Sequence, residues 1–430
     1  MRKVMKRLIA IGMLILSVLT LVSCAYRGNP YPKSDLTEER WMASVNNNAN
    51  TWSRGADRWF LTGDPNATEQ MNATAPDAVA ISTMNVRVGD FNNIKIDGPF
   101  QVQLFGSNER NSVYVYGPNT EVRQVAVEVR NGTLYINMAK DASYSRKMGQ
   151  VIIRVGVMNL NNLTNRGSGR VEGRQLRSNG LNIIAAGSGN MYLAGEMNVR
   201  CITQSGSGCV NVFGAVTPVM DIYTTGSGEV NVSGNIGIRT IQHHGSTDIN
   251  IIGANTDGLK INTDGSGKIG INGRANVREI TAKQNTCVYI YSSVSNSIYV
   301  YTSGNAKVGI AGNTSDLYVD ASGNSQFLGR YLCTLNAYVR AHDQAHINVT
   351  ATNKIYAAAT QGGSIYFFGT PDIMTQFLRD NGTVIPIWYD GKRSCMVQKP
   401  MYYKDSVPAY KPAQRYHWKN KQLVGPKGEG

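Results

Sequence analysis

A Gly-Ser-Gly phrase recurs through the middle of this chain at a nearly fixed interval, and this repeat limits the possible folds more than any other feature. Successive copies stand about 20 residues apart when they are aligned on their first glycine or on the residue that replaces it. At such a period each copy is one structural unit that stacks on the next. The aligned positions, called anchors below, are Gly167, Gly187, Gly206, Gly226, Gly245, Gly265, Gln284, Gly304, Gly323, Asp343 and Gln361.

Residues at equal distances from the anchors predict stacked β-strands. All eleven residues four positions after an anchor are apolar, from Val171 to Ile365, and none of those four positions before an anchor is polar. Mostly polar residues stand between these columns, so each segment alternates like a strand that buries one face. If each repeat is one coil, equal positions lie about 4.8 Å apart in adjacent coils. The sequence therefore predicts an all-β parallel β-helix, a solenoid with about 20 residues in each coil.

Glycine is expected at the corners of these coils. A coil of about 20 residues must turn sharply several times, and glycine tolerates both positive φ angles and close backbone approach. A phosphate-binding loop is the alternative explanation of Gly-Ser-Gly, but such a loop needs a following helix, and a strand pattern follows every copy. A second set of glycines stands eight positions after the anchors, at Gly195, Gly214, Gly234, Gly253, Gly273, Gly312 and Gly369.

The repeat resembles a known family. Repeated Gly-Ser-Gly before alternating strands, the triplet Gly270-Ile271-Asn272 and the phrase FNNIKIDGPFQVQLFG from Phe91 are similar to the putative auto-transporter adhesin, head GIN domain family. The resemblance covers residues 89–369. It implies a single-stranded right-handed β-helix in an exported or lipid-anchored bacterial protein, and it brings no catalytic residues.

The segments on both sides of the repeat are expected to close the solenoid. Residues 89–160 hold strand patterns without Gly-Ser-Gly and are predicted to form the first, wider coils. Residues 370–390 are predicted to form a capping helix and a strand: Thr370 is a suitable N-cap, Pro371 suits a first helical turn and Gly382 would end the helix.

The N-terminus resembles the signal of a bacterial lipoprotein. Residues 1–23 combine a basic start with an apolar run, and the following Leu21-Val22-Ser23-Cys24 resembles a lipobox. The resemblance implies a lipid on Cys24, a tether over residues 24–88 and, because Ala25 follows, anchoring in the outer membrane. An ordinary cleaved signal peptide or a short membrane helix is the alternative, although the apolar run is short for a bilayer span.

The positive charge is concentrated at the ends of the chain. Of the formal net charge of +14, residues 1–24 carry +4 and residues 391–430 carry +7, which leaves +3 for the rest. A nucleic-acid partner is therefore not expected, because such proteins spread basic charge over a folded face. The tail is either a solvated extension or a strap for an envelope protein or an anionic glycan. Its candidate binding residues are Tyr402, Tyr403, Tyr410, Arg415, Tyr416, Trp418 and Lys419.

One pair of carboxylates could support catalysis. Glu229 and Asp248 share an offset on adjacent coils, which would place their Cβ atoms about 5 Å apart, close to the carboxyl separation of retaining glycosidases. Lys268 stands next in the same column, so a surface ion-pair ladder is the ordinary explanation. Glycan degradation by these two carboxylates is therefore only an alternative function.

No cofactor or metal site is expected. His243 and His244 lie five coils from His342 and His346, and no Cys or His spacing suits zinc. Five cysteines besides Cys24 make an odd number, and most of them are expected to be free thiols.

One outward column suggests binding instead of catalysis. Asn211, Asn231 and Asn250 share one offset, where Tyr192, Tyr289 and Tyr366 occur on other coils. These side chains could contact an extended glycan or a protein, although asparagine ladders also stabilise stacked strands. We therefore predict a non-enzymatic, lipid-anchored binding or adhesion module, with a structural subunit of a larger envelope assembly as the main alternative.

Overall fold

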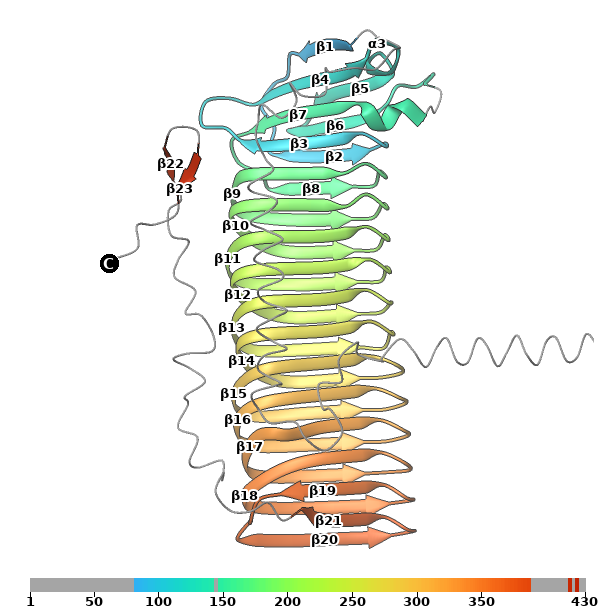
Figure 1. Ribbon diagram of the computed structural model, residues 1–430, viewed down its shortest axis with the longest axis vertical. Helices are drawn as coiled ribbons and strands as arrows, with labels where there is room; N and C mark the ends of the chain where they lie inside the picture. The colour runs from blue at the N-terminus through green and yellow to red at the C-terminus, as the bar shows by residue number, and fades with distance from the viewer. Residues whose placement is uncertain (1–80, 143–145, 388–416, 420–421, 425–430) are drawn as a thin grey trace, which may run out of the picture.

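The chain folds into a long β-solenoid with strands stacked at right angles to its axis (Figure 1). The computed structural model describes residues 81–142, 146–387, 417–419 and 422–424. The long strands β9 to β18 each run through most of one coil and pair in parallel with the next. They are β9 Val171–Ala185, β10 Met191–Gln204, β11 Cys209–Thr224, β12 Glu229–His243, β13 Asp248–Thr263, β14 Lys268–Ala282, β15 Cys287–Thr302, β16 Lys307–Ala321, β17 Gln326–Ala341 and β18 His346–Thr360.

The predicted columns form the core of the solenoid. Val230, Ile249 and Ile269 are register partners on three successive coils. Every residue four positions after an anchor is fully buried, with 0 % of its surface exposed from Val171 to Ile365. The prediction of a parallel solenoid with one apolar shaft is therefore confirmed, while its handedness stays a prediction.

The anchors are mostly 19 or 20 residues apart in alternation. The extra residue is accommodated at the corner about eight positions after the anchor. Between β15 and β16, Ile290 pairs with Ile310, but after the corner Ser293 pairs with Gly312, so the partner strand is one residue shorter across this turn. Between β16 and β17 the shift at the same place has the opposite sign. One residue is thus gained or lost per coil without moving the apolar columns off the core.

The corners at the anchors have two backbone conformations, one in the early coils and one in the late coils, although one conformation was expected. In the early coils the backbone at Gly-Ser-Gly stays out of the positive-φ region, and glycine is needed because the coils approach closely: a Cβ on Gly206 would lie 2.0 Å from the carbonyl oxygen of Gly187. From Gln284 onward the anchor adopts a left-handed conformation, with φ of 58° there and 57° at Asp343. Polar residues replace glycine in this last third because the left-handed corner accepts a side chain.

The N-terminal end is closed by a mixed sheet instead of wider coils. Strands β2 (Asn93–Asp97) and β3 (Gln101–Gly106) pair in parallel with β8 (Asn162–Asn165) and β9 on one side. On the other side they pair in parallel with β6 (Thr133–Met138) and β7 (Ile152–Val157).

Antiparallel pairs complete this cap. Strand β1 (Ile81–Val86), inside the expected tether, pairs with β4 (Ser112–Pro118), β4 pairs with β7, and β5 (Val125–Arg130) pairs with β6. The short helices α3 (Asn119–Val122) and η2 (Arg146–Gln150) connect these strands. Antiparallel strands can be joined by short turns, whereas parallel strands need a long crossover connection. A short segment can therefore cover the end of the solenoid.

The predicted capping helix over residues 370–390 is wrong. Strand β19 (Ser364–Phe368) is followed by two further strands, β20 (Ile373–Arg379) and β21 (Thr383–Ile387), in parallel register with β18 and β19. Asp380 follows Gln361 at the anchor spacing and has a φ of 51°, close to the 54° at Gln361. The repeat therefore continues for one more coil, and the ladder of β18 supplies backbone partners that a helix would not use.

Candidate binding surface

Four tyrosines form a stacked ladder on the outside of the last coils. Tyr299, Tyr318, Tyr338 and Tyr356 are register partners on β15 to β18. Their ring centroids are 4.7, 4.8 and 5.1 Å apart, and the planes of adjacent rings differ by 7°, 7° and 2°. The parallel strands thus hold four phenol rings as one continuous stack.

This tyrosine ladder presents hydroxyl groups and ring edges to the solvent. The ring faces inside the stack cover one another, while Tyr299 and Tyr356 at its two ends are exposed and the inner pair is half-buried. Partial burial, followed by the charge of Asp316 and the neighbouring rings, raises the pKa of the Tyr318 phenol. The ladder therefore offers a row of phenol hydroxyls at the spacing of the coils.

The asparagine column forms the predicted ladder, but its amides are used within the protein. Asn231 donates to Asn211 Oδ1 at 2.9 Å, and Asn250 donates to Asn231 Oδ1 at 3.0 Å. Asn211 and Asn231 are buried. On the same column Tyr366 packs at 4.7 Å from the His346 ring. This column therefore stabilises the stacked coils more than it presents a polar surface.

Glu229 and Asp248 are register partners on β12 and β13, as their shared offset predicted. Asp248 Oδ1 accepts a hydrogen bond from the backbone N–H of Lys268 at 2.8 Å, and Glu229 Oε1 accepts one from the Asn250 amide at 3.3 Å. Among the described residues, Lys268 forms no ion pair with either carboxylate. Both carboxylates therefore hold neighbouring coils together, although by hydrogen bonds and not by the expected ion-pair ladder.

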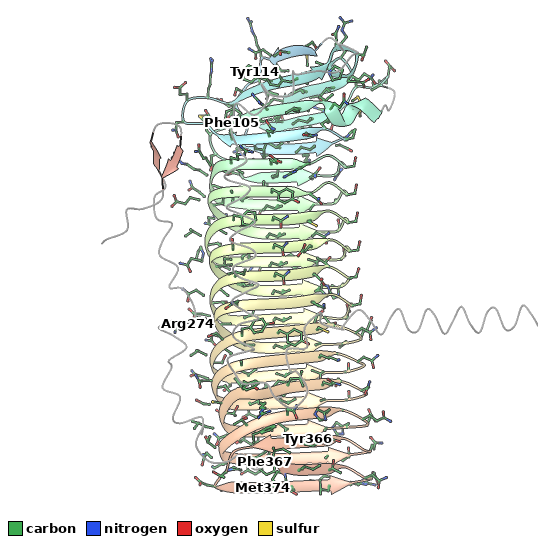
Figure 2. The ribbon with its side chains drawn as sticks, viewed as in Figure 1. Phe105, Tyr114, Arg274, Tyr366, Phe367 and Met374 are labelled. Carbon is green, nitrogen blue, oxygen red and sulfur yellow. The ribbon has the colours of Figure 1, made fainter. Side chains whose placement is uncertain are left out.

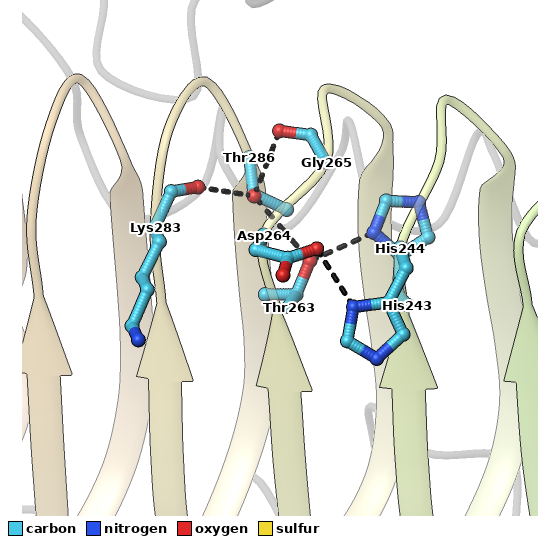
Figure 3. Close-up of polar contacts among 7 residues, drawn as sticks. All are labelled: His243, His244, Thr263, Asp264, Gly265, Lys283 and Thr286. Carbon is cyan, nitrogen blue, oxygen red and sulfur yellow. Dashed lines mark hydrogen bonds and ion pairs between the residues drawn. The ribbon is translucent and has the colours of Figure 1, made fainter.

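His243 is buried inside the corner between β12 and β13 (Figure 3). Its Nε2 lies 2.9 Å from the Thr247 carbonyl oxygen, and its Nδ1 lies 2.7 Å from Thr263 Oγ1. A carbonyl only accepts hydrogen bonds, so Nε2 carries the proton and Nδ1 accepts from the threonine. Its neighbour His244 points outward to Asp264, 2.7 Å away. His243 thus has two partners that suit a neutral ring, and it has a structural role.

Acidification is expected to destabilise the fold through His243. Burial lowers the pKa of this histidine below its usual value, so the unfolded chain binds the proton at a pH where the folded chain does not. Its stabilising contribution is complete above the unfolded pKa of about 6.5 and is lost as pH falls through the lower folded pKa. Urea unfolding at about pH 7 and about pH 5 should show a larger loss of stability for the natural chain than for His243→Gln.

Glutamine is the matched replacement because Gln204 occupies the same offset two coils away and hydrogen-bonds the corner carbonyls of Gly206 and Gly208. Other titrating groups are common to both chains, so only the difference between their pH profiles reports on His243. Identical profiles would remove this histidine as a source of acid sensitivity.

A protein-family comparison identifies the solenoid. The model of the family described as "Putative auto-transporter adhesin, head GIN domain" matches residues 90–236 and 272–371, more than half of the chain. The chain belongs to this family. The resemblance seen in the Gly-Ser-Gly repeats is therefore confirmed, and membership of a GIN-domain adhesin family supports a binding role at the cell envelope.

The solved structures that match this GIN-domain chain are distant from it. An adhesin-like protein from Bacteroides fragilis is 16 % identical over 73 % of this chain and 99 % of its own, with a TM-score of 0.22. A protein from Parabacteroides distasonis titled as lipid binding is 16 % identical over 72 % of this chain and 97 % of its own, with a TM-score of 0.27. These scores add nothing about function. A comparison with curated proteins finds no match.

The described part of this GIN-domain protein holds neither a clustered metal site nor a membrane-spanning helix. No three His, Cys, Asp or Glu side chains of these residues gather as metal ligands would. No helix in the same residues is long and apolar enough to cross a bilayer.

Most of the predicted partner-binding residues lie outside the described residues. These are Tyr402, Tyr403, Tyr410, Arg415 and Tyr416 in the tail; Cys24, the predicted lipidation site, also lies outside the described residues. Trp418 and Lys419 belong to β22 (His417–Lys419), which pairs antiparallel with β23 (Gln422–Val424). These seven tail candidates therefore remain predictions.

The expectation of mostly free thiols holds only in part. Cys201 and Cys209 are free, and burial raises the pKa of both thiols. Cys287 and Cys333 are each disulfide-bonded.

The tyrosine ladder is the main feature that the sequence analysis missed. Its members stand five positions before Gly304, Gly323, Asp343 and Gln361, so the offset method contained the signal. This outward column lies beside the apolar column before the anchors, and in the early coils it carries Asn182 and Asp221.

Proposed function

We propose that this protein is a lipid-anchored binding module of the outer membrane that contacts an envelope protein or glycan through the tyrosine ladder. The observation that carries the proposal is the stack from Tyr299 to Tyr356, whose end rings are 39 % and 37 % exposed. The lipid on Cys24 would hold the solenoid at the membrane. No step of this role requires catalysis, in keeping with the adhesin description of the family.

The geometry favours a ligand that runs along the solenoid axis. Because the ring faces stack on one another, a ligand meets the ladder through hydrogen bonds to the hydroxyls and contacts with the ring edges. Flanking polar groups add to the row: Asn336 donates to Asp316 Oδ1 at 2.9 Å beside Tyr318 and Tyr338. An extended chain, such as a glycan, that repeats its polar groups at about the coil spacing of 4.8 Å would match this row.

Removing two hydroxyls from the ladder should weaken binding without disturbing the fold. Tyr318→Phe combined with Tyr338→Phe keeps both rings and their stacking, and each lost hydrogen bond is worth about 1 kcal/mol. The two together should weaken adhesion to envelope fractions by about tenfold or more. The measurement is the apparent affinity of the purified chain for immobilised protein and glycan fractions of the envelope.

Tyr223→Phe is the matched control, because Tyr223 faces outward on β11 between Thr203 and Gln242 and has no stacked neighbour among these register partners. It should bind like the natural chain. If the double variant also binds like the natural chain, the ladder only stabilises the coils and the proposed contact is wrong.

A further inference from the structure

Among the described residues, no strand follows β21 to cover the core at the C-terminal end of the solenoid. Met374 and Leu378 on β20 lie directly over the buried Ile355 and Ala359 column of β18, yet they are 41 % and 49 % exposed. Met374 marks this end in Figure 2. Outward on the same strand, Phe377 is 59 % exposed. The last coil therefore presents the open cross-section of the apolar shaft.

The backbone of this coil is also open on one side. Among the described residues, β20 pairs only with β18 and β21 pairs only with β19. At the other end of the solenoid, β2 and β3 are paired on both sides. An exposed apolar edge strand without lysine or proline, such as β20, readily pairs with another chain.

We infer that two copies of this chain dock end to end through their last coils, related by a two-fold axis that passes between the two Gln376 residues. A two-fold interface uses the same patch on both copies and closes after two subunits. Stacking of one copy's end on the other copy's beginning would instead build a filament, but the edge of the first coil is already occupied by β6 and β7.

The core-facing side of the last coil is self-complementary under this axis. Antiparallel pairing centred on Gln376 sets Met374 opposite Leu378 of the second copy, so apolar residues meet on the core side. On β21 the same operation, centred on Ile385, sets Val384 opposite Pro386; both lie over the buried Ile365 and Phe367 column. The two shafts would then join into one continuous core.

Gln376 supports this axis independently. Its side chain lies over Ala357, a core position, and is exposed to solvent in the single copy. Among the described residues its amide has one hydrogen bond, to Met374 Sδ at 3.5 Å, and a thioether is a weak acceptor. On the two-fold axis, two Gln376 amides can donate to each other's carbonyl oxygens, and such a buried polar pair fixes register.

The charges at the edge do not oppose the contact. Arg379 pairs with Asp380 at 3.3 Å within one copy, and Asp372 is the remaining charge beside β20. The coil edge therefore carries a small net charge, unlike the tail of residues 391–430 with +7. This near-neutral, symmetric pattern fits a second copy better than a basic segment.

Cysteine cross-linking of the full-length chain tests the axis. Gln376→Cys places the thiol of one copy opposite the same thiol of the second copy. The Cα atoms of directly opposed residues are about 4.5–5.5 Å apart, within disulfide reach. Mild oxidation should give a covalent dimer. Ile373→Cys on the same strand is the control: it lies three residues from the axis, so the two copies of this thiol would be about 20 Å apart and should not link.

Analytical ultracentrifugation should show a dimer for the natural chain, and Met374→Lys with Leu378→Lys should raise its dissociation constant by at least about tenfold. Asn313→Lys, an exposed position on β16, should leave the dimer unchanged. A chain that is monomeric at all concentrations, or that links equally well from positions 373 and 376, would overturn the proposal. A dimer that forms only after residues 388–430 are removed would show that the tail occupies the edge, and would overturn it too.

Discussion

Phe327→Ala is expected to lower the free energy of unfolding by about 4 kcal/mol, within the usual range for truncating a buried phenylalanine. Phe327 is completely buried, and it lies between Val308 and Ile347 in the column that follows the anchors. Coils above and below are held by their own hydrogen-bond ladders, so they cannot collapse into the space that the ring leaves. The cavity cost therefore adds to the lost transfer free energy.

Urea unfolding measured by circular dichroism checks this value, with Gln326→Ala as the control. Gln326 precedes Phe327 on β17 and points outward, half-buried, so its loss should change stability by less than about 0.5 kcal/mol. A loss below about 1 kcal/mol for Phe327→Ala would mean that the shaft repacks around small residues, contrary to the close packing of protein interiors.

A second substitution shows why this ring is needed here. Gly329 stands where most coils have a large apolar residue, and a Cβ on it would lie 2.4 Å from Phe327 Cε1. Gly173 is the other glycine of that column, and there the side chain of Leu176 fills the space at 2.4 Å. Gly329→Ala should therefore destabilise the natural chain but cost less, or even stabilise, in the Phe327→Ala background.

The apolar columns could be predicted from the sequence, but the packing between neighbouring columns could not. The columns could be predicted because a parallel solenoid places like residues on like residues, and one spacing error would have moved them off the core. The packing of the large Phe327 side chain into the space left by Gly329 could not be predicted, because these two residues belong to different columns of one coil. Reading columns one at a time therefore identifies the shaft but not its packing.

The ends of the solenoid were harder to predict for a physical reason. A terminal coil has one neighbour instead of two, so its sequence need not keep the column pattern. Gln376 stands in the column that is apolar in all earlier coils, and Thr370, Pro371 and Gly382 together predicted a helix. Asp380, at the anchor spacing, carried the opposite signal. At the other end, β1, β4 and β5 pair in antiparallel fashion, so their sequences do not show the 20-residue repeat.

The candidate surface was only partly predictable. The stacking of Glu229 on Asp248 and of Asn211 on Asn231 follows from the repeat and is confirmed. Which stacked column is exposed could not be read from offsets, because exposure depends on the side chains of adjacent columns. The asparagines are buried for this reason, whereas Tyr299 and Tyr356 are exposed.

The corner glycines allow a test in which one substitution is made at two equivalent anchors. Gly206→Asn should cost about 3 kcal/mol or more, in the upper range for forced overpacking. The Cβ would lie 2.0 Å from the Gly187 carbonyl oxygen and 2.8 Å from the carbonyl carbon of Ala186. Both are backbone atoms of the neighbouring coil, so relief would require the two coils to separate.

Gly304→Asn should cost about 1 kcal/mol or less, because asparagine tolerates the left-handed region. Gly304 has a φ of 70°, and the same anchor holds Gln284 and Asp343 at 58° and 57° on nearby coils. Thermal and urea unfolding of the two variants measures the difference. Equal losses would mean that the early and late corners are one structure, so that glycine at the anchors reflects a shared φ requirement and not the close approach of the early coils.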